Sequence, residues 1–316
     1  MPIRPMRIVI AGGAGFLGSP LAEVYAEEGH DVRILTRALP SGEARHDPGT
    51  GVPGITRVGW TPDGRSGPWA TVLDGADAAI NLSGENIGGR RWTPQRKALL
   101  RDSRINPTRS LVAAMRTVGV PPPVFISASG VGFYGASGDE SKTESSPAGD
   151  DFLAHLCEDW EAEALRAATT ATRVVLVRSG VVLERSGGAL PKMITPFRFF
   201  AGGRMGSGRQ YMSWIHRHDW VEMVRWIVET PAATGPVNAT SPGPVTNREF
   251  ARALGSALTR PSLIPAPGFA LKLLLGEMAD PLVLTGQRVI PTRARALGYH
   301  FRYPDIGQAF RGIFGE

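Results

Sequence analysis

The stretch IVIAGGAGFLGSP, residues 8–20, decides the fold of this chain. An apolar run ends at Gly12 and Gly13, and glycine returns at Gly15 and Gly18 before a helical pattern begins. The spacing fits G-x-G-x-x-G and also G-x-x-G-x-x-G, after a strand and before a helix. The first glycines permit a tight turn, the middle one lets backbone approach a pyrophosphate, and the last lets helix pack on strand. The stretch therefore predicts dinucleotide binding at a helix N-terminus, where unpaired N–H groups face phosphates.

Strand-like and helix-like patterns alternate along the first 180 residues. Apolar, β-branched runs predict strands, and spaced apolar residues ending near glycine predict helices. Residues 38–55 are polar and rich in Gly and Pro, and we expect a loop there. The alternation predicts an α/β fold with a Rossmann-type, doubly wound parallel sheet. The predicted strands are 6–11, 31–37, 55–60, 77–84, 123–129 and 172–183, and the predicted helices are 16–28, 94–117 and 150–168.

The rhythm changes after Gly180, where a Gly- and Pro-rich stretch follows. We expect a strand over 211–216, a helix over 219–229 and a strand over 235–240, then helices mixed with Pro-rich turns. The sequence therefore predicts two parts. The first is a nucleotide-binding Rossmann domain of residues 1–180 plus about 211–240, and the second is a small substrate lobe of about 181–210 plus 241–316.

Composition excludes several classes of protein. The net charge is +6, but no dense Lys/Arg run with interleaved aromatic residues occurs, so we expect no nucleic-acid partner. Cys157 is the single cysteine, which rules out an intrachain disulfide and favours a reducing, cytoplasmic location. No apolar run approaches the roughly 18 residues of a membrane span, so we expect no membrane partner. No His, Cys or Asp cluster has the spacing of metal ligands, so we expect no metal.

The end of the second predicted strand indicates which cofactor binds. A carboxylate there would hold the ribose 2′-OH of NAD. The sequence instead has Leu35, Thr36 and Arg37, with no acidic residue. An arginine can pair with the 2′-phosphate of NADP through two parallel hydrogen bonds. The strand end therefore favours NADP(H) as the cofactor.

Several further motifs carry a resemblance. They are NLSGENI (81–87), SRINPTRSL (103–111), SASGVGFYG (127–135), FLAHLCEDWEAEA (152–164), VRSGVVLERSGGAL (177–190), GSGRQYMSWIHRHD (206–219), NATSPGPVTNREF (238–250) and GQRVIP (286–291). With GGAGFLG they resemble the extended short-chain dehydrogenases/reductases, and more narrowly the YfcH-like epimerase family, some of whose members are described as cell-division-inhibitor-like. The resemblance runs from end to end and implies a Rossmann sheet with a small C-terminal substrate lobe.

The resemblance also implies a site. The fourth predicted strand would line the ribose and phosphates of the cofactor, and the fifth would bring Ser129 beside the nicotinamide, with Ser127 as the alternative. A serine hydroxyl there would donate to a substrate carbonyl. The expected cofactor-binding residues are Gly12, Gly15, Phe16, Leu17, Gly18, Thr36, Arg37, Asn81, Leu82, Ser83 and Gly84. The expected catalytic residues are Ser129 and Tyr134.

The chain departs from the wider superfamily at the proton-transferring pair. Those enzymes use Tyr-x-x-x-Lys, in which the lysine lowers the pKa of a tyrosine that moves a proton. None of the five tyrosines in this chain has a lysine four residues later. Either another group moves the proton, or the reaction needs little proton transfer, or the protein binds NADP(H) without turnover. The candidate groups are Tyr134, Cys157, Glu158, His216 and His218.

Arginines near aromatic residues suit a flat or anionic small-molecule substrate. Such arginines are Arg90, Arg91, Arg178, Arg204 and Arg209. The carboxylates of WEAEA, Glu161 and Glu163, are expected on a solvated helix face.

The sequence thus predicts an NADP(H)-dependent oxidoreductase or epimerase-like enzyme, with a homodimer as one option for its assembly. The alternative is a non-catalytic, NADP(H)-binding regulator that acts on cell division through a protein partner.

Overall fold

A central eight-stranded sheet dominates the computed structural model, which describes residues 4–46 and 54–315. Its strand order is β12-β8-β6-β5-β1-β2-β4-β3, and every neighbouring pair is parallel except β3 with β4. The order reverses beside β1, which is the switch point of a doubly wound sheet. The predicted Rossmann-type α/β fold is confirmed. The strands are β1 (Arg7–Ala11), β2 (Asp31–Thr36), β3 (Ala44–His46), β4 (Ile55–Gly59), β5 (Ala78–Asn81), β6 (Val124–Gly130), β8 (Arg173–Ser179) and β12 (Gly235–Ala239).

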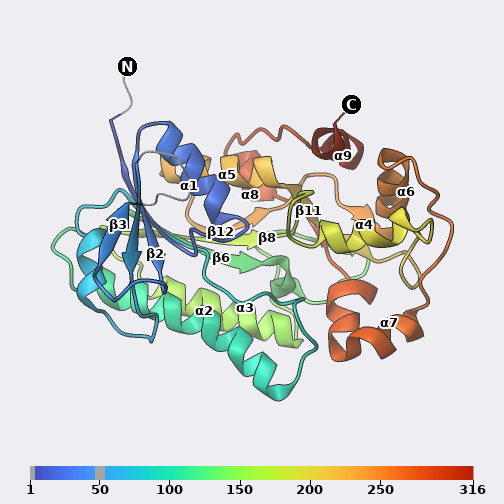
Figure 1. Cartoon of the computed structure of the whole chain (residues 1–316), viewed down its shortest axis with the longest axis horizontal. Helices are drawn as coiled ribbons and strands as arrows, with labels where there is room; N and C mark the ends of the chain where they lie inside the picture. Colours follow the sequence, from blue (N-terminus) through green and yellow to red (C-terminus); the bar gives the residue numbers. More distant parts are fainter. Residues whose placement is uncertain (1–3, 47–53, 316) are drawn as a thin grey trace.

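Helices cover both faces of this sheet (Figure 1). On one face, side chains of α1, α5 and α8 pack on Ile8, Ile10 and their neighbours. On the other, α2, α3 and the 3-10 helix η1 pack on Val9, Phe125 and Leu176. Strands buried on both faces are apolar throughout, which is why their sequences do not alternate. The helices are α1 (Gly18–Glu27), α2 (Pro94–Met115), α3 (Phe152–Leu165), α5 (Arg217–Glu229), α8 (Thr292–Ala296) and η1 (Pro68–Leu73).

The long helix α2 begins where the sequence predicts. Thr93 caps it by accepting a hydrogen bond from the Arg96 N–H at 3.1 Å, and Pro94 occupies the first helical position. Its C-terminus lies at Met115, close to the predicted end. The helix α3 begins in the same way, because the Asp151 side chain accepts from the Ala154 N–H at 2.9 Å.

Two predicted strands are broken in the structure. The strand predicted over 172–183 separates at Gly180 into β8 and β9 (Val181–Leu183), because the chain there passes within contact of the Ser213 carbonyl. A Cβ on Gly180 would lie 2.6 Å from that oxygen, so only glycine fits. The strand predicted over 211–216 divides into β10 (Tyr211–Met212) and β11 (Trp214–His216), and β11 pairs with β9 outside the main sheet.

The loop predicted over 38–55 is also partly wrong. Residues 44–46 form β3, which pairs antiparallel with β4 at the edge of the sheet. Pairing with the next strand along the chain, rather than its own periodicity, makes this segment extended. Residues 47–53 of the predicted loop lie outside the described part of the chain.

A separate apolar cluster lies at the other end of the molecule and includes Leu183, Phe197, Trp214, Phe250 and Phe310. The elements that contribute to it include α4 (Leu190–Arg198), β13 (Val245–Thr246), α6 (Asn247–Ala257) and α9 (Ile306–Phe314). Thr246 and Glu249 form a reciprocal capping box at the start of α6. The division into two domains stays a prediction. The elements not yet named are η2 (Val131–Tyr134), β7 (Ser141–Lys142), α7 (Gly268–Leu275), the 3-10 turn η3 (Gly276–Met278), the π-helical turn η4 (Asp280–Leu284) and β14 (Arg288–Val289).

Candidate functional site

The turn that joins β1 to α1 is closed tightly around its glycines. Gly12 adopts a φ of 80°, and its carbonyl accepts from the Gly15 N–H at 3.0 Å. A Cβ on Gly18 would contact that same carbonyl and lie 2.6 Å from the Gly13 Cα. A Cβ on Gly12 would lie 2.8 Å from the Leu82 carbonyl. Gly12 and Gly18 therefore exclude side chains because the backbone around them is crowded.

Gly15 differs from the other glycines of the turn. Its residue is exposed, and a Cβ there would meet only the Gly12 oxygen, at 3.2 Å. Open space in front of a helix N-terminus is where a pyrophosphate binds in this fold. The neighbouring Phe16 packs against Gly187 and Gly188, and Leu17 packs into the core. The sequence did not indicate that the 184–189 segment flanks the turn.

The end of β2 carries one exposed cation. Thr36 accepts from the Ala38 N–H through its hydroxyl at 3.2 Å and from the Trp60 N–H through its carbonyl. Arg37 is exposed and forms no ion pair within residues 4–46 and 54–315. β1 and β2 are neighbours, with Ala11 opposite Leu35, so Arg37 and the glycine turn belong to the same edge of the sheet. This edge can hold the pyrophosphate and the 2′-phosphate of an NADP molecule.

Hydrogen bonds to neighbouring elements fix the position of the segment after β5. The Asn81 amide donates to Thr108 Oγ1 at 2.8 Å and accepts from the Ser83 N–H at 3.1 Å, so this buried side chain positions the backbone of the turn. The Leu82 N–H donates to the Ala11 carbonyl at 2.8 Å. Gly84 lies against the Arg104 guanidinium, which a Cβ would approach to 3.2 Å. Residues 82–84 thus line the turn mainly with backbone.

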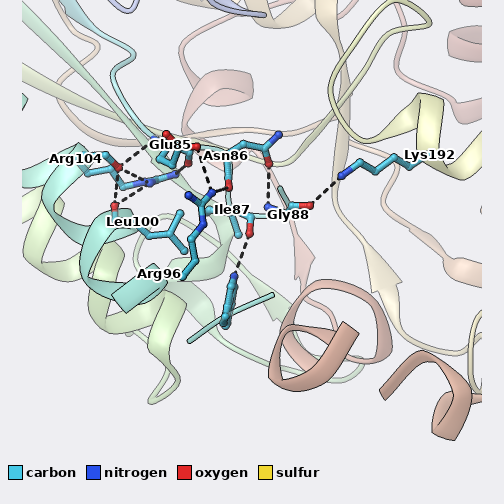
Figure 2. Close-up of polar contacts among 10 residues, drawn as sticks. Glu85, Asn86, Ile87, Gly88, Arg96, Leu100, Arg104 and Lys192 are labelled. Carbon is cyan, nitrogen blue, oxygen red and sulfur yellow. Dashed lines mark hydrogen bonds and ion pairs between the residues drawn. The ribbon is translucent and has the colours of Figure 1, made fainter. Parts of the chain in front are cut away.

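Residues 85–88 continue this segment and connect it to the other end of the molecule (Figure 2). Arg104 donates to the Glu85 carbonyl at 3.0 Å, and Arg96 donates to the Asn86 carbonyl at 2.5 Å. Lys192 of α4 donates to the Gly88 carbonyl at 2.9 Å. Burial lowers the pKa of Arg104 to about 10, because it removes the charged guanidinium from water.

Ser129, the first predicted catalytic residue, lies at the C-terminal end of β6 and is buried. Its hydroxyl donates to Glu161 of α3 at 2.6 Å. Glu161 also accepts two hydrogen bonds from Arg178, at 2.8 and 2.7 Å. Burial alone would lower the pKa of Arg178. The two hydrogen bonds that Arg178 donates to Glu161, and the charge of that carboxylate, outweigh burial and raise the pKa. Ser127, the alternative, is fully buried and donates to the Ala128 carbonyl.

Tyr134, the second predicted catalytic residue, belongs to the same buried network. Its hydroxyl donates to the Asn238 amide oxygen at 2.6 Å and accepts from Arg178 at 3.0 Å. Burial raises the pKa of Tyr134, so the phenol stays protonated at neutral pH and is a poor proton donor there. The hydrogens of Ser129 and Tyr134 are both directed to partners within the protein.

The expectation that Glu161 and Glu163 form a solvated helix face is wrong. Both carboxylates are buried, Glu161 against Arg178 and Glu163 beside Arg109. A buried carboxylate requires a cation or several donors, and arginines from other elements supply them here. Burial raises the pKa of Cys157 to about 11, so that thiol is neutral and a poor acid–base group near pH 7.

Other residues predicted to act in catalysis or substrate binding have partners elsewhere in the protein. His216 caps α5, accepting from the His218 N–H at 3.0 Å, and stacks on Tyr303 with ring centroids 4.0 Å apart. Two of the predicted substrate arginines bind backbone: Arg91 donates to two carbonyls at the end of α7, and Arg204 to the Gly206 carbonyl. Among the residues described, no three His, Cys, Asp or Glu side chains are grouped to hold a metal ion.

Comparisons with known proteins identify related families, sequences and a similar solved structure. The model of the NAD dependent epimerase/dehydratase family matches residues 8–239, and a domain of unknown function, DUF1731, matches residues 266–313. Epimerase family protein ML0860 of Mycobacterium leprae is 42% identical over 308 residues, 97% of this chain and 95% of that protein. YfhF of Bacillus subtilis is 39% identical over 312 residues, 98% and 99% of the two chains. Human epimerase family protein SDR39U1, crystallised with NADPH, superposes with a TM-score of 0.86 at 37% identity, covering 98% and 99%.

Proposed function

Because this chain belongs to the NAD dependent epimerase/dehydratase family, we propose that it binds NADP(H) at the turn after β1 and acts as an oxidoreductase or epimerase-like enzyme. The observation that carries the proposal is the open Gly15 turn at the same sheet edge as Arg37, which is exposed and forms no ion pair with any described residue. The NADPH in the crystal structure of the human relative supports the choice of cofactor.

The structure changes what Ser129 would do. Since its hydrogen goes to the Glu161 carboxylate, its remaining lone pairs are what it offers to a substrate. Ser129 then accepts a hydrogen bond from a substrate hydroxyl or amide, rather than donating to a carbonyl. We propose a small-molecule substrate. The exposed Arg90 and Arg209 would suit an anionic one.

The cofactor assignment predicts a selective loss in one variant. Arg37→Ala should weaken NADPH binding by about 1.5–3 kcal/mol, a factor of about 10 to 100, because a charged hydrogen bond to the 2′-phosphate is lost. NADH binding should change little, since NADH has no such phosphate. Fluorescence titration of the purified protein with both nucleotides measures this difference. Equal weakening of both would contradict the assignment of Arg37, and no binding of either by the wild type would contradict the cofactor.

A regulator without turnover is the second candidate. It is favoured by the missing Tyr-x-x-x-Lys pair and by the internal partners of Ser129 and Tyr134. A panel of carbonyl and enone substrates, followed by NADPH absorbance, separates it from the enzyme. Tight NADPH binding with no turnover on the panel would favour the regulator.

If turnover is found, Ser129→Ala should lower kcat by about 10- to 100-fold, because one positioned hydrogen bond to the substrate is lost. Its NADPH affinity should be unchanged, and this serves as the control for folding. Unchanged kcat would show that Ser129 does not contact the substrate.

A further inference from the structure

A ridge of exposed apolar side chains runs along the end of the molecule built from α4, α6 and α7. We call it the lobe ridge and define it as residues 198–200, 260–264 and 269–274. Seven of the ten large hydrophobic residues exposed in the described part of the chain lie on it. The most exposed are Leu263 at 84%, Leu273 at 79% and Phe269 at 78%. Helix α7 has no fully buried residue: Leu275 packs against the cluster around Leu100 and Leu153, while Phe269, Leu273 and Leu274 stay exposed.

The parts of the ridge are connected through backbone contacts. The Ile264 N–H donates to the Gly202 carbonyl at 3.1 Å, and the Ala266 N–H donates to the Arg204 carbonyl at 2.9 Å. The segment that enters α7 therefore lies beside the segment that leaves α4. Figure 1 shows both at the same edge of the molecule, with α7 below α4. Residues 198–200 and 260–264 therefore belong to neighbouring segments, and α7 follows the second of them.

The lobe ridge carries net positive charge, although its Lys272 forms an ion pair with Asp280 at 3.0 Å. Residues 190–212 and 250–276 contain seven Lys and Arg and no Asp or Glu. Arg198 and Arg260 are exposed and form no ion pair among the described residues. The Arg260 guanidinium lies over the Phe200 ring, 4.8 Å from its centroid. Cations interleaved with apolar side chains suit a surface that is both anionic and apolar.

A hydrogen-bonded turn after α4 sets the position of Phe200, which has a φ of 58°. The Phe200 N–H donates to the Phe197 carbonyl at 3.0 Å, and the Ala201 N–H donates to the Pro196 carbonyl at 2.9 Å, which is a common way for a helix to end. This turn leaves Phe200 57% exposed on the ridge.

We propose that the lobe ridge docks on an anionic lipid bilayer, with its apolar side chains among the headgroups and its cations on lipid phosphates. A second copy of this chain is a poorer occupant, because two ridges face to face would bring like charges together. In residues 4–46 and 54–315 no helix is long and apolar enough to cross a bilayer. The expectation of no membrane partner rested on spanning segments, and docking at a surface requires none.

Co-sedimentation with vesicles tests the proposal. We expect the full chain to bind vesicles of phosphatidylcholine mixed with phosphatidylglycerol, and to bind vesicles of phosphatidylcholine alone at least about tenfold more weakly. Raising the salt concentration should weaken binding to the anionic vesicles, because salt screens exposed charges.

Two variants locate the surface. Phe269→Ser with Leu273→Ser removes apolar contact, and Arg198→Glu with Arg260→Glu reverses charge. Each should weaken binding to anionic vesicles by about tenfold or more. Matched controls away from the ridge are Val120→Ser with Leu165→Ser, and Arg65→Glu with Arg311→Glu, all exposed residues. The controls should bind like the wild type, and all proteins should keep the melting temperature of the wild type.

Four outcomes would overturn the proposal. They are no binding to anionic vesicles, equal binding to neutral and anionic vesicles, equal losses in ridge and control variants, and a concentration-dependent dimer that only the ridge variants dissociate. The last outcome would assign the ridge to a second copy.

Discussion

The glycines of the first turn differ in what a side chain would meet. Gly18 lies where helix α1 starts against the turn, and a Cβ would press on the Gly12 carbonyl and the Gly13 Cα. Gly15 faces open space apart from the Gly12 oxygen at 3.2 Å. Gly18 is therefore needed for the fold, and Gly15 for the space in front of the helix.

Alanine substitutions should separate these two needs. Gly18→Ala should destabilise the protein by about 1–3 kcal/mol, because the added methyl overpacks a closed turn. Gly15→Ala should change stability by less than about 1 kcal/mol and weaken NADPH binding by about tenfold or more, because its methyl occupies the pyrophosphate space. Urea unfolding and NADPH titration measure the two effects. Similar losses of stability in both variants would contradict this distinction.

Residue-level prediction from sequence succeeded for the glycines and failed for Glu161. The glycine spacing encodes a local turn, which the structure contains. The partner of Glu161 is Arg178, on a different element 17 residues away, and their burial depends on how α3 packs against β8. The cofactor and catalytic roles given to individual residues stay predictions.

At the scale of elements, helix α5 begins at a histidine that is buried in its neutral form. Burial lowers the pKa of His216 from 6.5 to about 4, and its Nε2 has no hydrogen-bond partner among the residues described. A histidine whose pKa is lower in the folded state contributes stability above pH 6.5. That contribution is lost as the pH falls from 6.5 towards 4.

His216 should therefore make the protein acid-sensitive. Between pH 7 and pH 5 it should remove about 2 kcal/mol from the free energy of unfolding. His216→Asn keeps a side-chain acceptor at the helix cap but cannot be protonated in this range, so its stability should fall less over the same interval. Urea unfolding of both proteins at the two pH values measures the difference. An equal fall in both would exclude His216 as the cause.

Element prediction was accurate where periodicity is local. The strands β1, β2, β4, β5 and β6 and helix α2 follow from apolar runs, a cap and a proline. It missed β3, and it did not predict the breaks between β8 and β9 or between β10 and β11. The strands β9, β10 and β11 are two or three residues long and pair with segments far away in the sequence, which no local window contains.

At the scale of the whole molecule, one apolar cluster joins the Rossmann helices to the C-terminal region. Leu100 of α2 and Leu153 and Leu156 of α3 pack with Trp92 and with Met278 of η3. Lys192 adds a contact from α4 to the 85–88 segment. These connections predict that the molecule unfolds as one cooperative unit, whatever domain boundaries are drawn.

Met278→Ala tests this connection. Removing a buried methionine side chain should lower the free energy of unfolding by about 2–5 kcal/mol. Leu274→Ala, at an exposed position in α7, serves as the control and should change the free energy of unfolding by less than about 0.5 kcal/mol. Urea unfolding followed by fluorescence and circular dichroism should give coincident transitions for the wild type. Two separate transitions would show that the parts unfold independently.

The single cysteine has a consequence for how the molecule can be studied. Cys157 is buried under the end of β6, and with a pKa of about 11 only about one thiol in 10⁴ is thiolate at pH 7. A thiol reagent therefore reacts with it mainly when α3 separates from the sheet. The rate of that reaction in native buffer is an opening rate. The reactivity of this one thiol therefore reports on the motions that expose the interior of the protein.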